Sequence, residues 1–228
     1  MGTPGRRVAL VLGLSVLGAG LLAQSASAAP LPILATDTLD FESEEYTMAQ
    51  GTKAAFHNAE VGVPHSVVAD GQLAGSPLFR SPTFPGDATR QVSGTQYLTT
   101  GDYTFFCSVH QNMRAVLRVT AAGTPVPRPA FRLAILTGTL EKAQATGRIR
   151  VKIRGLTKSD NVTLKLRLGA KLLGMKTGVD VRAGQVRRPF VNLTRRGRAR
   201  IAGREQAKLK LVGIVPFGKT RAVKKLLK

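Results

Sequence analysis

The stretch that decides the fold of the first half is Gly101–Val119, GDYTFFCSVHQNMRAVLRV. It contains two apolar, strand-like runs, 102–107 and 114–119, joined by a tight loop. Cys107, the only cysteine of the chain, ends the first run, while His110 lies in the loop and Met113 begins the second. So short a loop brings a thiolate, an imidazole and a thioether to one end of a sandwich.

A second imidazole comes from His65, in the turn Gly62–His65. Two histidines, one cysteine and a weak axial methionine are the ligands of a type 1 copper site, whereas zinc more often takes a fourth hard or thiolate ligand. The alternative is a buried free cysteine beside an unrelated surface histidine. His57 competes with His65, but it follows Phe56 on a predicted strand and faces the opposite side. We therefore favour His65.

The region Glu45–Val119 resembles a cupredoxin of the plastocyanin/amicyanin group. The resemblance covers about a third of the chain, and the gap before the methionine is short, as in amicyanin. The residues that match are Phe56-His57-Asn58, Pro64-His65, Gly101–His110 and Met113. It implies a Greek-key β-sandwich that carries single electrons, with one copper held by His65, Cys107, His110 and Met113. It also implies that electrons leave through His110, at the solvent edge.

Two positions depart from the family pattern. Ser66 stands where the family commonly has asparagine after the first ligand, so it keeps a backbone amide near the sulfur but lacks the side-chain amide. Arg114 follows the methionine, where glycine is frequent nearby, and its charge would raise the potential and favour anionic partners. Asn58 is expected either to tie the ligand loops together or to be an ordinary turn asparagine.

Composition excludes several classes of protein. The 228 residues carry a net charge of +21 with one cysteine and three histidines, which excludes a disulfide scaffold and a multi-metal centre. Residues 1–28 have the basic start, the apolar run and the Ala26-Ser27-Ala28 end of a secretory signal. The apolar run is shorter than a membrane span, so we expect the signal to be cleaved and the mature protein to be secreted, with association to the cell wall as a further possibility.

Charge divides the mature chain at the Pro-rich segment 122–130, which is typical of a linker. Residues 29–121 carry five basic and nine acidic side chains. From residue 122 to residue 228 there are 27 basic and four acidic side chains. We therefore predict an all-β chain with a cupredoxin domain at 29–121 and a second, basic domain at 131–228.

Alternation marks the second domain as a sandwich of half-buried strands with cationic outer faces. In Arg148–Arg154 every second residue is basic and the others are aliphatic, and 162–168 and 207–211 repeat the pattern. The architecture resembles the immunoglobulin-like modules of bacterial secreted proteins. A short helix is expected after Thr194, which would be its N-cap.

The basic domain has two interpretations: a solvated face that keeps the protein soluble, or a surface that holds an anionic cell-wall polymer or lipid headgroups. Nucleic acid is disfavoured because aromatic side chains for base stacking are scarce. We expect a secreted type 1 copper protein that passes electrons to a redox protein and is not an enzyme. The alternative is a copper-storage or polyanion-binding protein without electron transfer.

Overall fold

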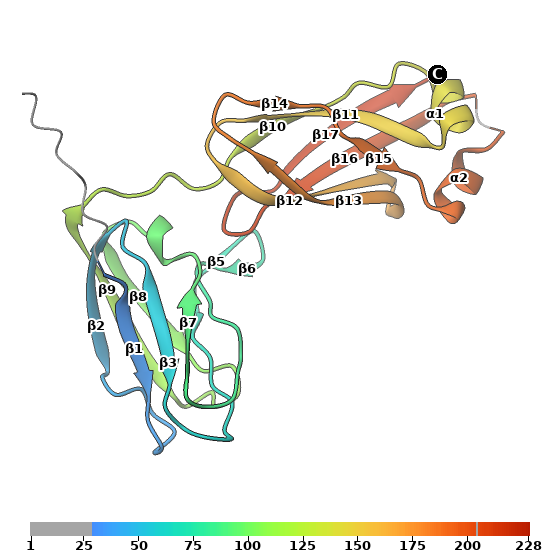
Figure 1. Ribbon diagram of the computed structural model, residues 1–228. Coiled ribbons are helices and arrows are strands. Elements are labelled where there is room, and N and C mark those ends of the chain that lie inside the picture. The colour runs from blue at the N-terminus through green and yellow to red at the C-terminus, as the bar shows by residue number, and fades with distance from the viewer. Residues whose placement is uncertain (1–28, 204) are drawn as a thin grey trace, which may run out of the picture.

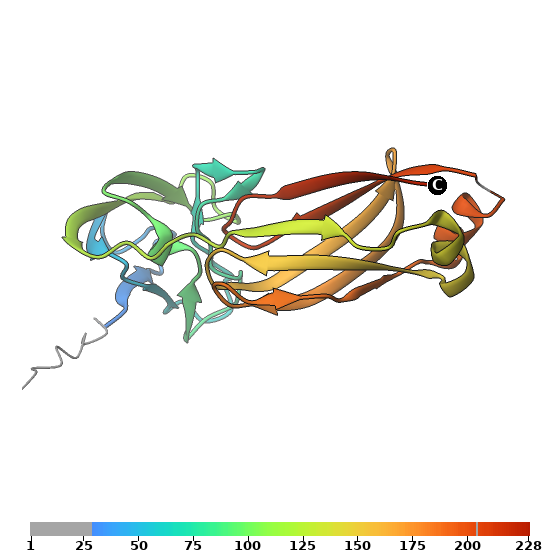
Figure 2. The ribbon, with the colours of Figure 1, turned by 90° about the horizontal axis from the view of Figure 1, so that it is seen from above.

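The computed structural model describes residues 29–203 and 205–228. Within these residues the chain forms two β-sandwiches joined by an extended segment (Figure 1, Figure 2). Apart from two short α-helices and one 3-10 turn, the regular elements of this part are strands, which confirms the all-β prediction. The predicted signal, 1–28, lies outside the described residues, and no helix among those described is long and apolar enough to cross a membrane.

Two sheets and a small hairpin make up the first sandwich. One sheet has the order β1-β3-β7 and the other β2-β9-β8-β4, with β1 parallel to β3 and β2 parallel to β9. The bounds are β1 Leu31–Ala35, β2 Glu45–Gln50, β3 Ala54–Asn58, β4 Val68–Ala69, β7 Ala88–Val92, β8 Gly101–Phe106 and β9 Arg114–Gly123. The hairpin pairs β5 (Gln72–Leu73) with β6 (Ser76–Pro77).

Aromatic rings fill the core of the first sandwich around Phe105. Its ring centroid lies 4.8 Å from that of Phe41 and 6.1 Å from those of Tyr46 and Phe79. Strand alternation points Phe105 inward, and Cys107, two residues later, is fully buried as well. The strand that delivers the cysteine is thereby anchored in the core. Tyr97-Leu98 has strand-like side chains and would be expected in a strand, but that expectation is wrong: Gly94, with φ 106°, starts the 3-10 turn η1 (Thr95–Tyr97) there.

Two four-stranded sheets form the second sandwich. One combines β10 and β11 with β14 and β15, and the other has the order β13-β12-β16-β17. The bounds are β10 Phe131–Ile135, β11 Arg148–Gly155, β12 Ser159–Leu168, β13 Lys171–Val181, β14 Val186–Arg187, β15 Phe190–Asn192, β16 Ala207–Ile214 and β17 Arg221–Leu227. The three predicted alternating strands are confirmed as β11, β12 and β16. Likeness to an immunoglobulin module stays a prediction.

Alternation sorts the side chains of this sandwich as expected. On β11 the aliphatic residues Ile149, Val151 and Ile153 are fully buried, and the basic residues between them face outward. The predicted helix is α2 (Arg195–Ile201), whose cap Thr194 accepts a hydrogen bond from the backbone N–H of Gly197. A helix that we did not predict, α1 (Leu140–Thr146), precedes β11.

The two sandwiches have separate cores and a small contact. One core spans Ile33 to Val119 and the other Phe131 to Leu227. Between the sandwiches, the ring of Phe217 lies 6.5 Å from that of Tyr97, and Arg128 donates a hydrogen bond to the Phe217 carbonyl. Desolvation at this place lowers the pKa of Arg128.

Candidate metal centre

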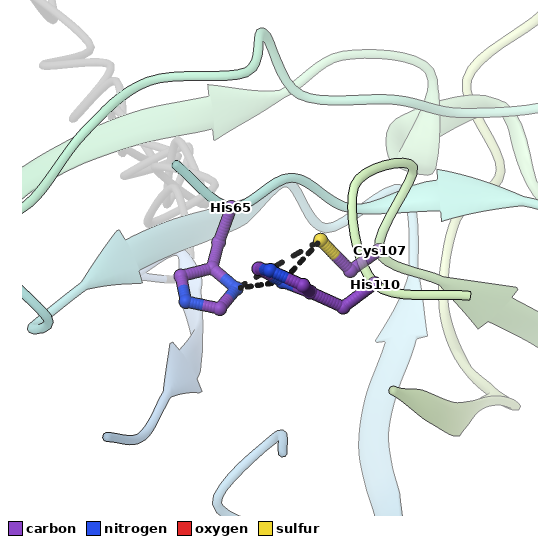
Figure 3. Close-up of side chains that lie close together, drawn as sticks. All are labelled: His65, Cys107 and His110. Carbon is purple, nitrogen blue, oxygen red and sulfur yellow. Dashed lines mark hydrogen bonds between the residues drawn. The ribbon is translucent and has the colours of Figure 1, made fainter. Parts of the chain in front are cut away.

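Three side chains converge at the end of the first sandwich opposite the extended segment (Figure 1, Figure 3). Cys107 Sγ lies 3.8 Å from Nδ1 of His65 and 3.8 Å from Nδ1 of His110, and the two Nδ1 atoms are 3.3 Å apart. His65 and Cys107 are fully buried, whereas His110 is partly exposed. The ligand atoms of the three residues lie within 4.8 Å of one another, which makes this group a candidate metal centre.

Backbone hydrogen bonds close the loop that carries two of these residues. The N–H of Cys107 donates to the carbonyl of Met113 at 3.0 Å, and the N–H of Met113 donates to the carbonyl of His110 at 3.0 Å. These bonds join the end of β8 to the start of β9. Cys107 and His110 are therefore fixed relative to each other by main-chain atoms.

His65 is fixed by a different set of backbone contacts. Its N–H donates to the Phe84 carbonyl, and the N–H of Phe84 donates back to the His65 carbonyl. The fully buried Asn58 adds a tie, because its amide donates to the carbonyls of both Val63 and Phe84 at 2.8 and 3.0 Å. Asn58 thus binds the loop that presents His65, whereas a role in tying that loop to the Cys107 loop stays a prediction.

A carboxylate sets the tautomer of His65. Glu60 Oε2 lies 2.9 Å from His65 Nε2, on the far side of the ring from Cys107. An ionised carboxylate only accepts hydrogen bonds, so this contact places a proton on Nε2 and leaves Nδ1 as the nitrogen that would bind a metal ion. This arrangement of a carboxylate behind a histidine is typical of metal-ligating histidines.

Two serines join the two ligand loops. The Ser66 hydroxyl lies 2.8 Å from that of Ser108 and accepts a hydrogen bond from the Ser108 backbone N–H at 3.0 Å. Each serine directly follows a member of the cluster, His65 or Cys107. The hydroxyl of Ser66 therefore makes the link between the two loops.

The remaining candidate residues lie as follows. Met113 lies three residues after His110, is 1% exposed and packs in the core of the first sandwich. Its role as axial ligand stays a prediction. His57 lies outside the cluster, on β3, with its Nδ1 3.1 Å from the Thr89 hydroxyl. Arg114 lies over the ring of Phe106 and pairs with Asp70 at 3.0 Å, and its effect on the potential stays a prediction.

The geometry fits one small metal ion. Bonds of about 2.0 Å to nitrogen and about 2.3 Å to sulfur in a trigonal plane would separate sulfur from nitrogen by about 3.7 Å and the nitrogens by about 3.5 Å. The observed separations of 3.8, 3.8 and 3.3 Å are within a few tenths of an ångström of these values. One thiolate with two imidazoles is a donor set that suits copper.

Sequence reasoning missed two residues of the centre, Glu60 and Ser108. A glutamate five residues before a histidine in an irregular loop follows no helical or strand spacing, so no pattern indicated the pair. Ser108 directly follows Cys107, and the similar position of Ser66 after His65 was the available signal.

Comparison with known proteins gives distant similarities. No family model and no curated protein matches the chain. Amicyanin from Paracoccus versutus is 23% identical over 42% of this chain and 86% of its own, with a TM-score of 0.35. A reduced Cu(I) form of an amicyanin mutant is 18% identical over 42% and 87%, with a TM-score of 0.35. A copper-containing nitrite reductase from Thermus scotoductus is 20% identical over 40% and 22%, with a TM-score of 0.33. Likenesses this distant assign no function, which therefore rests on the side chains described above.

Proposed function

We propose that this protein binds one copper ion at the His65–Cys107–His110 centre and carries single electrons. The observation that carries the proposal is the convergence of one sulfur and two Nδ1 atoms, with His65 held in its ligating tautomer by Glu60. Copper bound there would supply a one-electron couple between Cu(I) and Cu(II). Met113 is the proposed weak fourth ligand.

Rigidity of the centre favours electron transfer over substrate chemistry. The main-chain bonds around Cys107 and His65, and the serine link between their loops, hold the donor atoms at separations that suit an ion. Donor atoms fixed in this way would change their positions little when the bound ion gains or loses an electron. His110, the partly exposed member, offers the route by which a redox protein would exchange electrons with the centre.

An enzymatic role would need a further reactive group near the centre. The chain has three histidines, and the one outside the cluster, His57, contacts Thr89 on the outer face of a strand. His65 and Cys107 are buried, so of the three residues only His110, which is partly exposed, faces solvent. These observations favour a carrier that makes and breaks no substrate bond.

The charge of the second domain supports a role in location. With 27 basic and four acidic residues from 122 onward, this part would be attracted to anionic polymers or headgroups outside the cell. We propose that the protein is exported and that the basic domain holds it near such a surface. The metal centre lies at the far end of the first sandwich from the linker, since β9 begins at the centre and ends at Gly123 (Figure 1).

The visible spectrum of the copper-loaded protein, followed through a redox titration, tests the proposal. An intense blue band from thiolate-to-copper charge transfer that bleaches reversibly on reduction is expected. Cys107→Ala should abolish the band, and His57→Ala, which changes a histidine outside the centre, should keep it. A colourless copper complex that does not cycle would favour copper storage and contradict electron transfer.

A further inference from the structure

A hollow lined by cations lies in the second sandwich and includes residues of helix α1, whose place in the fold is seen in Figure 1. Its volume is about 530 Å³. Lys142 on α1, Arg148 and Arg150 on β11, Arg188 between β14 and β15, and the ring of Phe190 on β15 line it. We call these five residues the arginine hollow. No acidic side chain is among the residues that line it.

The three guanidinium groups of the arginine hollow pair with no carboxylate of the described residues, and two of them lie over a ring. Those of Arg148 and Arg150 lie 4.4 and 5.7 Å from the centroid of Phe190. Across residues 29–203 and 205–228, the side chains of Arg148, Arg150 and Arg188 form no hydrogen bond or ion pair. Their N–H donors are therefore available to a ligand, and the ring restricts the orientation of two of them.

Like charges gathered in this way repel one another in the absence of a ligand. Arg148 and Arg150 are two residues apart on one face of β11, and Arg150 lies opposite Phe190 in register. Cations around a concave, low-dielectric wall concentrate the positive potential inside it. An anion that enters the hollow would relieve the repulsion, so the site is selective for negative charge.

A row of cations continues from the hollow along the same strand. Lys152 and Arg154 follow Arg150 on the outer face of β11, and Arg132 on β10 lies directly opposite Arg154. Successive members of the row are about 6.6 Å apart along the strand, so four of them span about 20 Å. A linear polyanion could place one charged group in the hollow and others along the row.

The predominance of arginine among the cations of the hollow favours one class of anion. Three of the four cations in the hollow are arginines, whose planar fork matches two oxygens of one phosphate group. Phe190 is 40% exposed, but two guanidinium groups lie over its ring, so the ring is less available to enter a lipid layer or to stack on a base. A non-nucleic-acid polymer with repeated phosphate groups therefore fits better than a membrane or a nucleic acid.

We propose that the arginine hollow binds a phosphate group of an anionic extracellular polymer and that the β11 row binds the phosphate groups that follow it. This inference rests on the proposed tethering role of the basic domain and gives that role a specific site and ligand chemistry. It does not depend on the copper centre, which lies in the other sandwich.

The test compares two triple variants of the full-length protein that lose the same charge. Arg148→Gln/Arg150→Gln/Arg188→Gln removes the hollow, and Lys208→Gln/Lys210→Gln/Lys224→Gln removes exposed or half-exposed cations of the other sheet. The probe is inorganic polyphosphate, with affinity measured by calorimetry at several salt concentrations. The arginine variant should lose affinity by about tenfold or more and the lysine variant by about threefold or less, because only the former removes the forked donors.

Further measurements distinguish the possible ligands, and they distinguish a failure of the arginine hollow from a failure of the tethering role. Polyphosphate should bind more tightly than polyglutamate, oligothymidylate of equal charge or phosphatidylglycerol vesicles. If one of these three ligands binds more tightly than polyphosphate, the assignment of the ligand is overturned. Equal losses in both triple variants would overturn the hollow but leave tethering intact. A wild-type protein that binds no polyanion would overturn tethering as well. If the arginine triple does not fold, Arg188→Gln, which lies outside the strands, replaces it with Lys208→Gln as its control.

Discussion

In the metal centre, Glu60 and His65 form a contact of 2.9 Å between Oε2 and Nε2, while Nδ1 of the same ring lies 3.8 Å from Cys107 Sγ. The two ring nitrogens of His65 therefore have different roles. Nε2 donates a hydrogen bond to the carboxylate of Glu60, and Nδ1 faces the centre as the nitrogen that would bind the ion. Glu60 reaches His65 within a five-residue loop whose position is held by Asn58. The orientation of the ring is thus built into the protein before any ion binds.

Removing the carboxylate should weaken copper binding. Glu60→Ala leaves Nε2 without an acceptor, so the ring loses both its orientation and its tautomer preference, and we expect copper affinity to fall by about 10- to 100-fold. Glu60→Gln keeps an amide oxygen that can accept the same hydrogen bond and should retain most of the affinity. Competition with a chelator of known affinity measures both variants. Equal affinities for wild type and Glu60→Ala would show that the contact does not orient the ligand.

The serine link should contribute to stability even without metal. Ser66 is fully buried, and Ser66→Ala leaves the Ser108 N–H without its acceptor, which costs about 1–3 kcal/mol of unfolding free energy. Denaturant unfolding of the metal-free protein gives the value. Ser76→Ala, at an exposed position on β6, is the control and should change it by less than about 0.5 kcal/mol. A loss of the same small size for Ser66→Ala would mean that water replaces the link.

Short-range sequence signals account for much of what could be predicted. The loop 107–113 is so short that Cys107 and His110 had to lie at one end of the sheet, and the alternation in Arg148–Arg154 determined which face of β11 is buried. Thr194 marked the start of α2. In each case a few adjacent residues carry the structural preference.

Features that depend on tertiary contacts or on weak local signals were missed. Glu60 meets His65 only because Asn58 and Phe84 shape the loop between them. The run at Tyr97 has strand-like residues, yet Gly94 adopts a left-handed φ and turns the chain into a 3-10 turn. Helix α1 has seven residues between the cap Thr139 and Gly147, too few for a helical period to stand out.

The thioether of Met113 should tune the redox potential. Met113→Leu conserves side-chain volume in the core, so the free energy of unfolding should change by less than about 1.5 kcal/mol. Loss of a weak sulfur donor disfavours Cu(II) more than Cu(I), and the potential should therefore rise while the blue colour persists. A redox titration against the wild type measures the shift. An unchanged potential would show that Met113 serves only as core packing.

The contact between the sandwiches should depend on Phe217. Its half-buried ring lies beside Tyr97 and so close to Gly94 that a Cβ added there would come within 2.7 Å of the ring. The hydrogen bond that Arg128 donates to Phe217 uses the main-chain carbonyl and survives truncation of the side chain. Phe217→Ala should therefore weaken the contact and let the sandwiches reorient about the extended segment 124–130.

Small-angle X-ray scattering of Phe217→Ala tests this expectation, with a broader distribution of interatomic distances and a larger radius of gyration as the expected result. The copper spectrum should not change, because the metal centre lies at the opposite end of the first sandwich. Val126→Ala, an exposed position on the extended segment, is the control and should scatter like the wild type. Superimposable profiles for Phe217→Ala and wild type would mean that the remaining contacts alone fix the two sandwiches, and the basic domain would then hold the metal centre in one fixed direction from its anchoring surface.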